Sequence, residues 1–109
     1  MRLQLKISEK LTDKINSDLS MKNFVFDSLR RFNRKDWGMI CESEKILNEM
    51  AIRIGKDIFG VCRQDKTFVR IVIRVTSQRA FLEIFLFDEL KDGTQQFILH
   101  SADGKLLSN

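Results

Sequence analysis

After a short alternating segment at residues 3–7, the spacing of apolar residues changes at Gly55, and that change constrains the fold more than any other feature. Before Gly55, apolar residues recur every three or four positions, as they do along one side of an α-helix. After it, they alternate with polar residues, as in β-strands that bury one face. Helices followed by a run of strands are typical of an α+β domain.

Two amphipathic helices are expected before Gly55. The first is predicted to start at Ser20 as its N-cap and to end near Asn33. The second is predicted to start near Ser43 and to end at Gly55, because glycine commonly caps a helix C-terminus. The apolar stripe of the first helix is Met21, Val25, Leu29 and Phe32. That of the second is Ile46, Leu47, Met50 and Ile54.

The remaining elements are short. Residues 3–7 alternate as in a strand, and Ser8 can then cap a brief helix. Later strands are predicted over 58–62, 67–75, 80–87 and 95–100, separated by turns over 64–66, 76–79 and 91–93. We therefore expect two or three N-terminal helices packed on a C-terminal antiparallel β-meander of about four strands. Residues 1–109 suit one domain, with a frayed tail over 102–109.

Composition bounds the function. Nineteen basic and 15 acidic residues give a net charge of +4, which permits attraction to nucleic acid without requiring it. No apolar run approaches the roughly 18 residues that span a bilayer, and Met1–Lys6 has no signal-peptide core, so we expect a cytoplasmic protein with no membrane partner. Cys41 and Cys62 lie far apart and are expected to be free thiols. The absence of tyrosine excludes recombinases, relaxases and topoisomerases that use a tyrosine nucleophile.

No residue pattern points firmly to catalysis. The one histidine, His100, lacks the partners of a triad or a zinc site, and Cys62 has no base nearby in the sequence. The five glycines are scattered, so no phosphate-binding loop is present. Glu89-Leu90-Lys91 matches half of a metal-dependent nuclease motif, with Asp57 or Asp65 as the upstream carboxylate, but such spacings are common in a chain that is 31% charged. We therefore expect no enzyme activity, no cofactor and no metal.

A basic cluster at the end of the first long helix has two interpretations. Its cations could hold phosphates while Phe32 and Trp37 stack on bases. Alternatively, the cations offset the helix dipole and the two aromatic residues belong to the core. The cluster consists of Arg30, Arg31, Arg34 and Lys35.

A second candidate surface lies on the sheet. A hairpin between Val75 and Ala80 places two arginines on the same face as three phenylalanines and a glutamate, whereas the other face is aliphatic and can be covered by the two helices. This partner-binding set is Arg70, Arg74, Phe81, Glu83, Phe85 and Phe87. Two alternatives remain open: the chain ends fold over these phenylalanines, or the phenylalanines pack in a homodimer.

The middle of the chain, from Phe24 to Leu90, resembles a family of short proteins carried on plasmids and integrative elements of Gram-positive bacteria. The shared residues, in order, are Asp36-Trp37-Gly38, Glu42, Glu44, Lys45, Asn48, Gly55, Arg79 and Asp88-Glu89. The chain departs from the family at Met39, Ser43 and Asp57, and Lys91–Asn109 lies beyond the family's usual end.

The resemblance implies a small accessory protein of a phage, plasmid or transposon, acting in the cytoplasm of a bacterial host cell. Such proteins often bind a host enzyme or defence complex stoichiometrically, as anti-CRISPR proteins do. Our leading hypothesis is an inhibitor that occludes a protein or ribonucleoprotein target such as a Cas nuclease. The competing hypothesis is a small nucleic-acid-binding regulator that uses the basic cluster.

Overall fold

A computed structural model describes residues 4–76, 81–93 and 96–100. The predicted turn over 76–79 falls largely outside these ranges, and Arg79 and the predicted tail over 102–109 fall wholly outside them. Within the described ranges, every helix is too short or too polar to cross a lipid bilayer.

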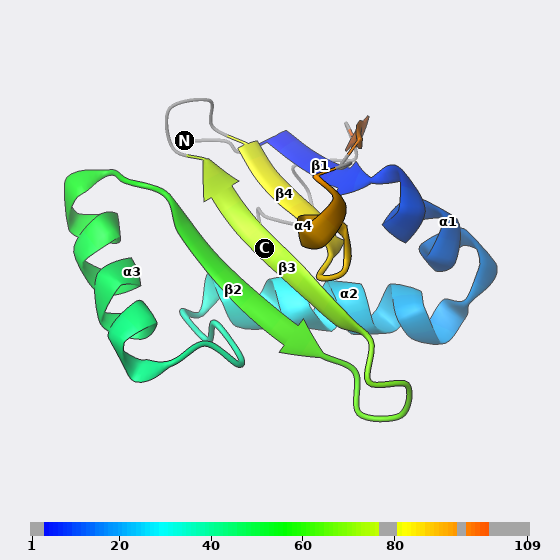
Figure 1. Ribbon diagram of the computed structural model, residues 1–109, viewed down its shortest axis with the longest axis horizontal. Coiled ribbons are helices and arrows are strands. Elements are labelled where there is room, and N and C mark those ends of the chain that lie inside the picture. Colours follow the sequence, from blue (N-terminus) through cyan, green and yellow to red (C-terminus); the bar gives the residue numbers. More distant parts are fainter. Residues whose placement is uncertain (1–3, 77–80, 94–95, 101–109) are drawn as a thin grey trace.

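One mixed sheet of five strands forms the centre of the fold, in the order β2-β3-β4-β1-β5. The strands are β1 (Gln4–Ser8), β2 (Ile58–Arg63), β3 (Arg70–Thr76), β4 (Phe81–Leu86) and β5 (Phe97–His100). The first three strands of this order form the predicted antiparallel meander. The prediction of a purely antiparallel sheet was wrong, because β1 pairs in parallel with β4 and separates it from β5 (Figure 1).

In the part of the chain that the structure describes, four helices accompany the sheet: α1 (Glu9–Ser17), α2 (Leu19–Asn33), α3 (Glu42–Ile54) and the one-turn α4 (Glu89–Asp92), which extends into the turn predicted over 91–93. Ser8 caps α1 as predicted, since its Oγ accepts a hydrogen bond from the Leu11 N–H at 3.2 Å. Ser20 is not the N-cap of α2. Asp18 is, and its carboxylate accepts a bond from the Ser20 N–H at 2.9 Å. Gly55 ends α3 with a φ of 70°, as predicted.

The core lies between the aliphatic face of the sheet and α2, which runs across that face (Figure 1). From α2, the buried apolar residues are Met21, Val25, Leu29 and Phe32. From the sheet, they include Leu5, Ile7, Ile71, Ile73, Leu82 and Ile84. Helix α1 packs beside α2 and next to β1 and β4. We predicted that the two long helices, α2 and α3, would both cover this face. The prediction was correct for α2 and wrong for α3, which lies beside the outer edge of β2, and the short helix α1 takes its place (Figure 1).

Two groups of hydrogen bonds occupy the outer edge of β2. Val61 donates its N–H to the Trp37 carbonyl at 3.0 Å and accepts a bond from the Met39 N–H at 2.7 Å, so residues 37–39 form a short bridge to the strand. The amide of Asn48 on α3 donates to the Phe59 carbonyl at 2.7 Å and accepts from its N–H at 3.3 Å. These contacts protect an edge that would otherwise be open to pairing with another chain.

Candidate functional site

The second face of the sheet carries phenylalanines and cations side by side, as the sequence predicted. In the register of β3 and β4, Val72 lies opposite Phe85 and Arg74 lies opposite Glu83. A cation covers each ring of the predicted set: Lys6 lies 3.6 Å from the Phe81 centroid, Arg70 lies 3.9 Å from the Phe87 centroid, and Arg74 lies 5.0 Å from the Phe85 centroid. Cation–π contacts of this kind shield the rings from water.

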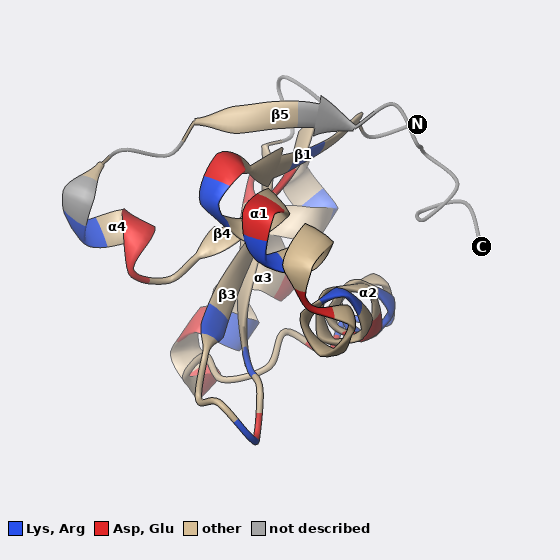
Figure 2. Ribbon diagram, turned by 90° about the vertical axis from the view of Figure 1, so that its right-hand side faces the viewer, with Lys and Arg blue, Asp and Glu red and all other residues tan. Residues whose placement is uncertain are grey.

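Phe85 is fully buried, so it is not the exposed anchor that the sheet-face hypothesis needed. Its ring meets the edge of Phe97 on β5 at a centroid distance of 5.9 Å, and Arg74 lies over it. Neither end of the described chain folds over this face; β1 and β5 extend the sheet and contribute Lys6 over Phe81 and Phe97 against Phe85. In Figure 2, α4 and α2 lie on opposite sides of the sheet. Phe81 and Phe87 are half-buried.

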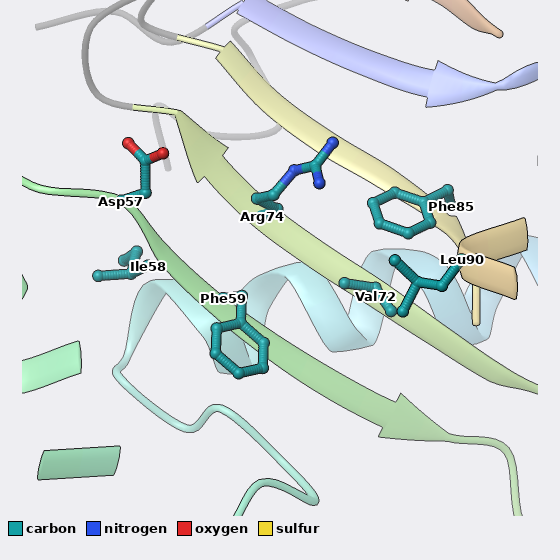
Figure 3. Close-up of a pocket in the computed structure, with 7 residues that line it drawn as sticks. All are labelled: Asp57, Ile58, Phe59, Val72, Arg74, Phe85 and Leu90. Carbon is teal, nitrogen blue, oxygen red and sulfur yellow. The ribbon is translucent and has the colours of Figure 1, made fainter. Parts of the chain in front are cut away.

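A groove of about 290 Å³ remains open on this face, over β2, β3 and β4 (Figure 3). Val72 and Phe85 form its buried floor, and the half-exposed Leu90 of α4 forms one wall. Its other lining residues are Asp57, Ile58, Phe59 and Arg74. The groove therefore combines apolar walls with one charged residue from β3 and another just before β2, which is the composition of a typical small binding pocket.

Arg74 is held in place by Glu83. The Arg74 Nη2 and Nε atoms lie 2.8 Å and 2.9 Å from the same carboxylate oxygen, and Glu83 is the more buried partner. The arginine side chain is 38% exposed, so it is not fully enclosed by its contacts with Glu83 and Phe85. A guanidinium held in this way can donate further hydrogen bonds to a carboxylate of a partner.

The basic cluster at the end of α2 is exposed but partly neutralised. Arg30 and Arg31 both reach Asp27, at 3.8 Å and 3.3 Å. Lys35 and Lys45 line a pocket with three acidic residues, Asp36, Glu42 and Glu49, so carboxylates outnumber cations there and oppose phosphate binding. Figure 2 shows acidic and basic residues interspersed along the helices.

The aromatic neighbours of this cluster are in the core. Phe32 is 5% exposed and Trp37 is 4% exposed, so neither ring can stack on a base. The structure therefore supports the second interpretation of Phe32 and Trp37, as core residues.

Two of the residues considered for catalysis, Glu89 and Cys62, are buried in the fold. Glu89 is buried, and one of its carboxylate oxygens accepts bonds from the Ser8 hydroxyl and the Leu86 N–H, both at 2.7 Å. Burial raises the pKa of the Cys62 thiol, which favours the unreactive protonated form. Within residues 4–76, 81–93 and 96–100, no three acidic, cysteine or histidine side chains gather closely enough to hold a metal ion. His100 ends β5, opposite Leu5.

The feature that sequence reasoning missed is the outward orientation of α3. The four apolar residues of its stripe are between 55% and 67% exposed, and Met39, just before the helix, is 57% exposed. The side of α3 that faces β2 instead buries Asn48 and Ala51. One signal was present in the sequence, because Ala51 and Ile52, one turn after Asn48, give the side opposite the stripe apolar residues of its own.

Comparison with protein-family models, curated proteins and solved structures found no match to this chain. Several of the residues that carry the family resemblance, including the Asp-Trp-Gly signature, make contacts that hold the fold together. The Asp36 carboxylate accepts a bond from the Gly38 N–H at 3.2 Å, Trp37 is buried, and Gly38 adopts a φ of 73° against Val61. Asn48 closes the β2 edge, and Glu44 accepts a bond from the Cys41 N–H at 3.0 Å.

Proposed function

We propose that this chain is a small accessory protein of a mobile genetic element that inhibits a host defence complex by binding it stoichiometrically, most specifically as an anti-CRISPR protein that binds a Cas nuclease in the bacterial cytoplasm. The observation that carries the proposal is the open groove over Val72 and Phe85, with Arg74 positioned at its side. Apolar pockets with few, well-oriented polar groups are common binding sites.

The groove is suited to a protein segment rather than to nucleic acid. Its floor and walls are apolar, so an apolar side chain of the target would be the central anchor. Lys6, Arg70 and Arg74 on the same face favour acidic neighbours around that anchor. The mechanism is then occlusion, in which the bound chain blocks a channel or holds the nuclease in an inactive conformation.

The test is an affinity pull-down of the tagged chain from a host lysate that contains the CRISPR nucleases, with and without nucleic-acid digestion. The proposal expects a Cas effector to be retained after digestion and its DNA cleavage to stop at a one-to-one ratio. Leu90→Glu, on the wall of the groove, should abolish capture, whereas Leu19→Glu, an equally radical change at an exposed position of α2, should not. Equal capture by both variants would exclude the groove.

Phe85→Ala is not a useful probe, because Phe85 is fully buried and its truncation would cost about 3–5 kcal/mol of stability. Leu90 avoids this problem, since it is 46% exposed. Circular dichroism of Leu90→Glu should therefore match that of the wild-type chain.

The competing function is a nucleic-acid-binding regulator, which the exposed Arg34 and Lys35 and the net charge of +4 favour. It predicts binding that weakens steeply with salt, because phosphate contacts release counterions. Alanine at Arg30, Arg31, Arg34 and Lys35 should then abolish binding. Recovery of nucleic acid alone in the pull-down, lost on digestion, would favour this function over the first.

A further inference from the structure

Helix α3 has an apolar side that nothing in the described chain covers. Each residue turns an α-helix by about 100°, so Ile46, Met50 and Ile54 lie on the side opposite Asn48, which is fixed to β2. Leu47 extends this stripe along one flank. Single exposed apolar residues are ordinary, but four on one helix side, each more than half exposed, form a contiguous patch of the kind that marks an interface.

The charges of α3 indicate what covers this patch. Glu42 and Glu44 lie in the first turn, Arg53 lies in the last turn, and Lys56 follows directly. Lys45 lies 3.6 Å from the Glu42 carboxylate, so the N-terminal end of the helix has two acidic residues against one basic residue, and its C-terminal end is basic. This distribution is complementary to the same helix running in the opposite direction, and antiparallel helices also oppose their dipoles.

A two-fold axis produces that arrangement. In a symmetric dimer, the same patch of both copies meets itself, so each contact occurs twice. An axis that crosses the helix midway between Ile46 and Met50 would stack Ile46 of each copy on Met50 of the other and place Glu42 of each copy near Arg53 of the other. The charged residues Lys45, Glu49 and Arg53 follow one flank of the stripe, where they would form the polar rim of such a contact.

We propose that the chain forms a homodimer through antiparallel pairing of α3 with α3 of a second copy, centred between Ile46 and Met50. This inference goes beyond the proposed function and does not depend on it, because the groove lies over the sheet beside Phe85, whereas the α3 stripe faces away from the edge of β2. It also differs from dimerisation through the phenylalanine face, whose rings are already covered by cations and by β5.

The first experiment is sedimentation equilibrium of the full chain from low micromolar to millimolar concentration. The wild-type chain and Leu19→Glu should both pass from the mass of one chain to that of two. Leu47→Glu should raise the dimer dissociation constant at least about tenfold, because a charge replaces a desolvated apolar contact. Circular dichroism should show the wild-type helix content in both variants. A chain that stays monomeric throughout, or a dimer that Leu47→Glu leaves unchanged, would overturn the proposal.

A charge exchange tests the direction of pairing. Arg53→Glu alone should weaken the dimer by repulsion from Glu42 of the other copy, and adding Glu42→Arg should restore it. In a parallel pairing, the two positions lie at opposite ends, so the second change would not rescue the first. A double variant no stronger than Arg53→Glu therefore excludes the antiparallel arrangement.

Discussion

Helices α2 and α3 have the same kind of sequence but opposite environments. Both carry four apolar residues at helical spacing, yet α2 buries its stripe under the sheet and α3 turns its stripe to the solvent. The difference comes from the residues on the other side of each helix. α2 has charged residues there, whereas α3 has Asn48, whose amide pairs with the backbone of β2. Periodicity thus identifies a stripe but not what covers it.

The largest expected effect is a direct comparison of one leucine from each stripe. Leu29 is 1% exposed and Leu47 is 61% exposed. Leu29→Ala should lower the free energy of unfolding by about 2–5 kcal/mol, because it leaves a cavity in the core. Leu47→Ala should change it by less than about 0.5 kcal/mol. Urea denaturation at low protein concentration measures both, and similar losses would show that α3 is packed as α2 is.

Substitutions at Gly38 and Gly55 test whether the segment before α3 is bound to the edge of β2. Gly38 and Gly55 have φ values of 73° and 70°, but a Cβ at Gly38 would lie 2.0 Å from the Val61 carbonyl oxygen, whereas one at Gly55 meets nothing within 4 Å. Gly55→Ala should cost about 1–2 kcal/mol for its left-handed backbone. Gly38→Ala should cost about 2 kcal/mol more, because it also breaks the two hydrogen bonds to Val61. Equal losses in thermal unfolding would contradict the bridge to β2.

Asn48 tests the contact that orients α3. Asn48→Ala should cost about 1–3 kcal/mol, because the N–H and carbonyl of Phe59 lose their side-chain partner. It should also speed aggregation by opening the edge of β2. Asn23→Ala, at an exposed position of α2, is the matched control and should have little effect on either. Chemical denaturation and light scattering check the two expectations.

The smallest expected effect is a pH dependence at the start of α3. The hydrogen bond from the Cys41 N–H lowers the pKa of Glu44 below 4.5. The stabilisation from this bond is therefore full above the unfolded-state pKa and is lost as the pH falls through the folded-state pKa. The stability difference between wild type and Glu44→Gln should shrink on acidification below pH 4.5. A stability difference that stays constant down to pH 2 would show that the ionised Glu44 carboxylate does not stabilise the start of α3. Glu49→Gln is the control, because Glu49 lies outside the first turn of the helix.

Local chemistry made much of the fold predictable. The ends of α3 near Ser43 and at Gly55, the cap at Ser8 and the meander from β2 to β4 follow rules that involve residues close in sequence. The shared face of Arg74, Glu83 and Phe85 followed from alternation alone. The start of α2 was missed because Asp18 and Ser20 are both good N-caps, and the structure uses the first.

What could not be predicted depends on contacts between distant residues. The insertion of β1 between β4 and β5 pairs Gln4 with Phe81 and Ser8 with Phe97, which are distant in the sequence, and no local pattern encodes that pairing. The burial of Phe85 depends on Phe97 and Arg74, which come from two other strands. The groove likewise exists because α4 places Leu90 beside β3 and β4 (Figure 3).

Methyl NMR with a soluble paramagnetic agent tests the contrast between α2 and α3 most directly. Three leucines report on it: Leu29 in the core, Leu19 exposed on α2 and Leu47 on the α3 stripe. The account predicts that Leu29 is protected and Leu19 is broadened at every protein concentration. Leu47 should be broadened in dilute solution and protected in concentrated solution. Protection of Leu47 in the dilute monomer, or its broadening at every concentration, would contradict the account.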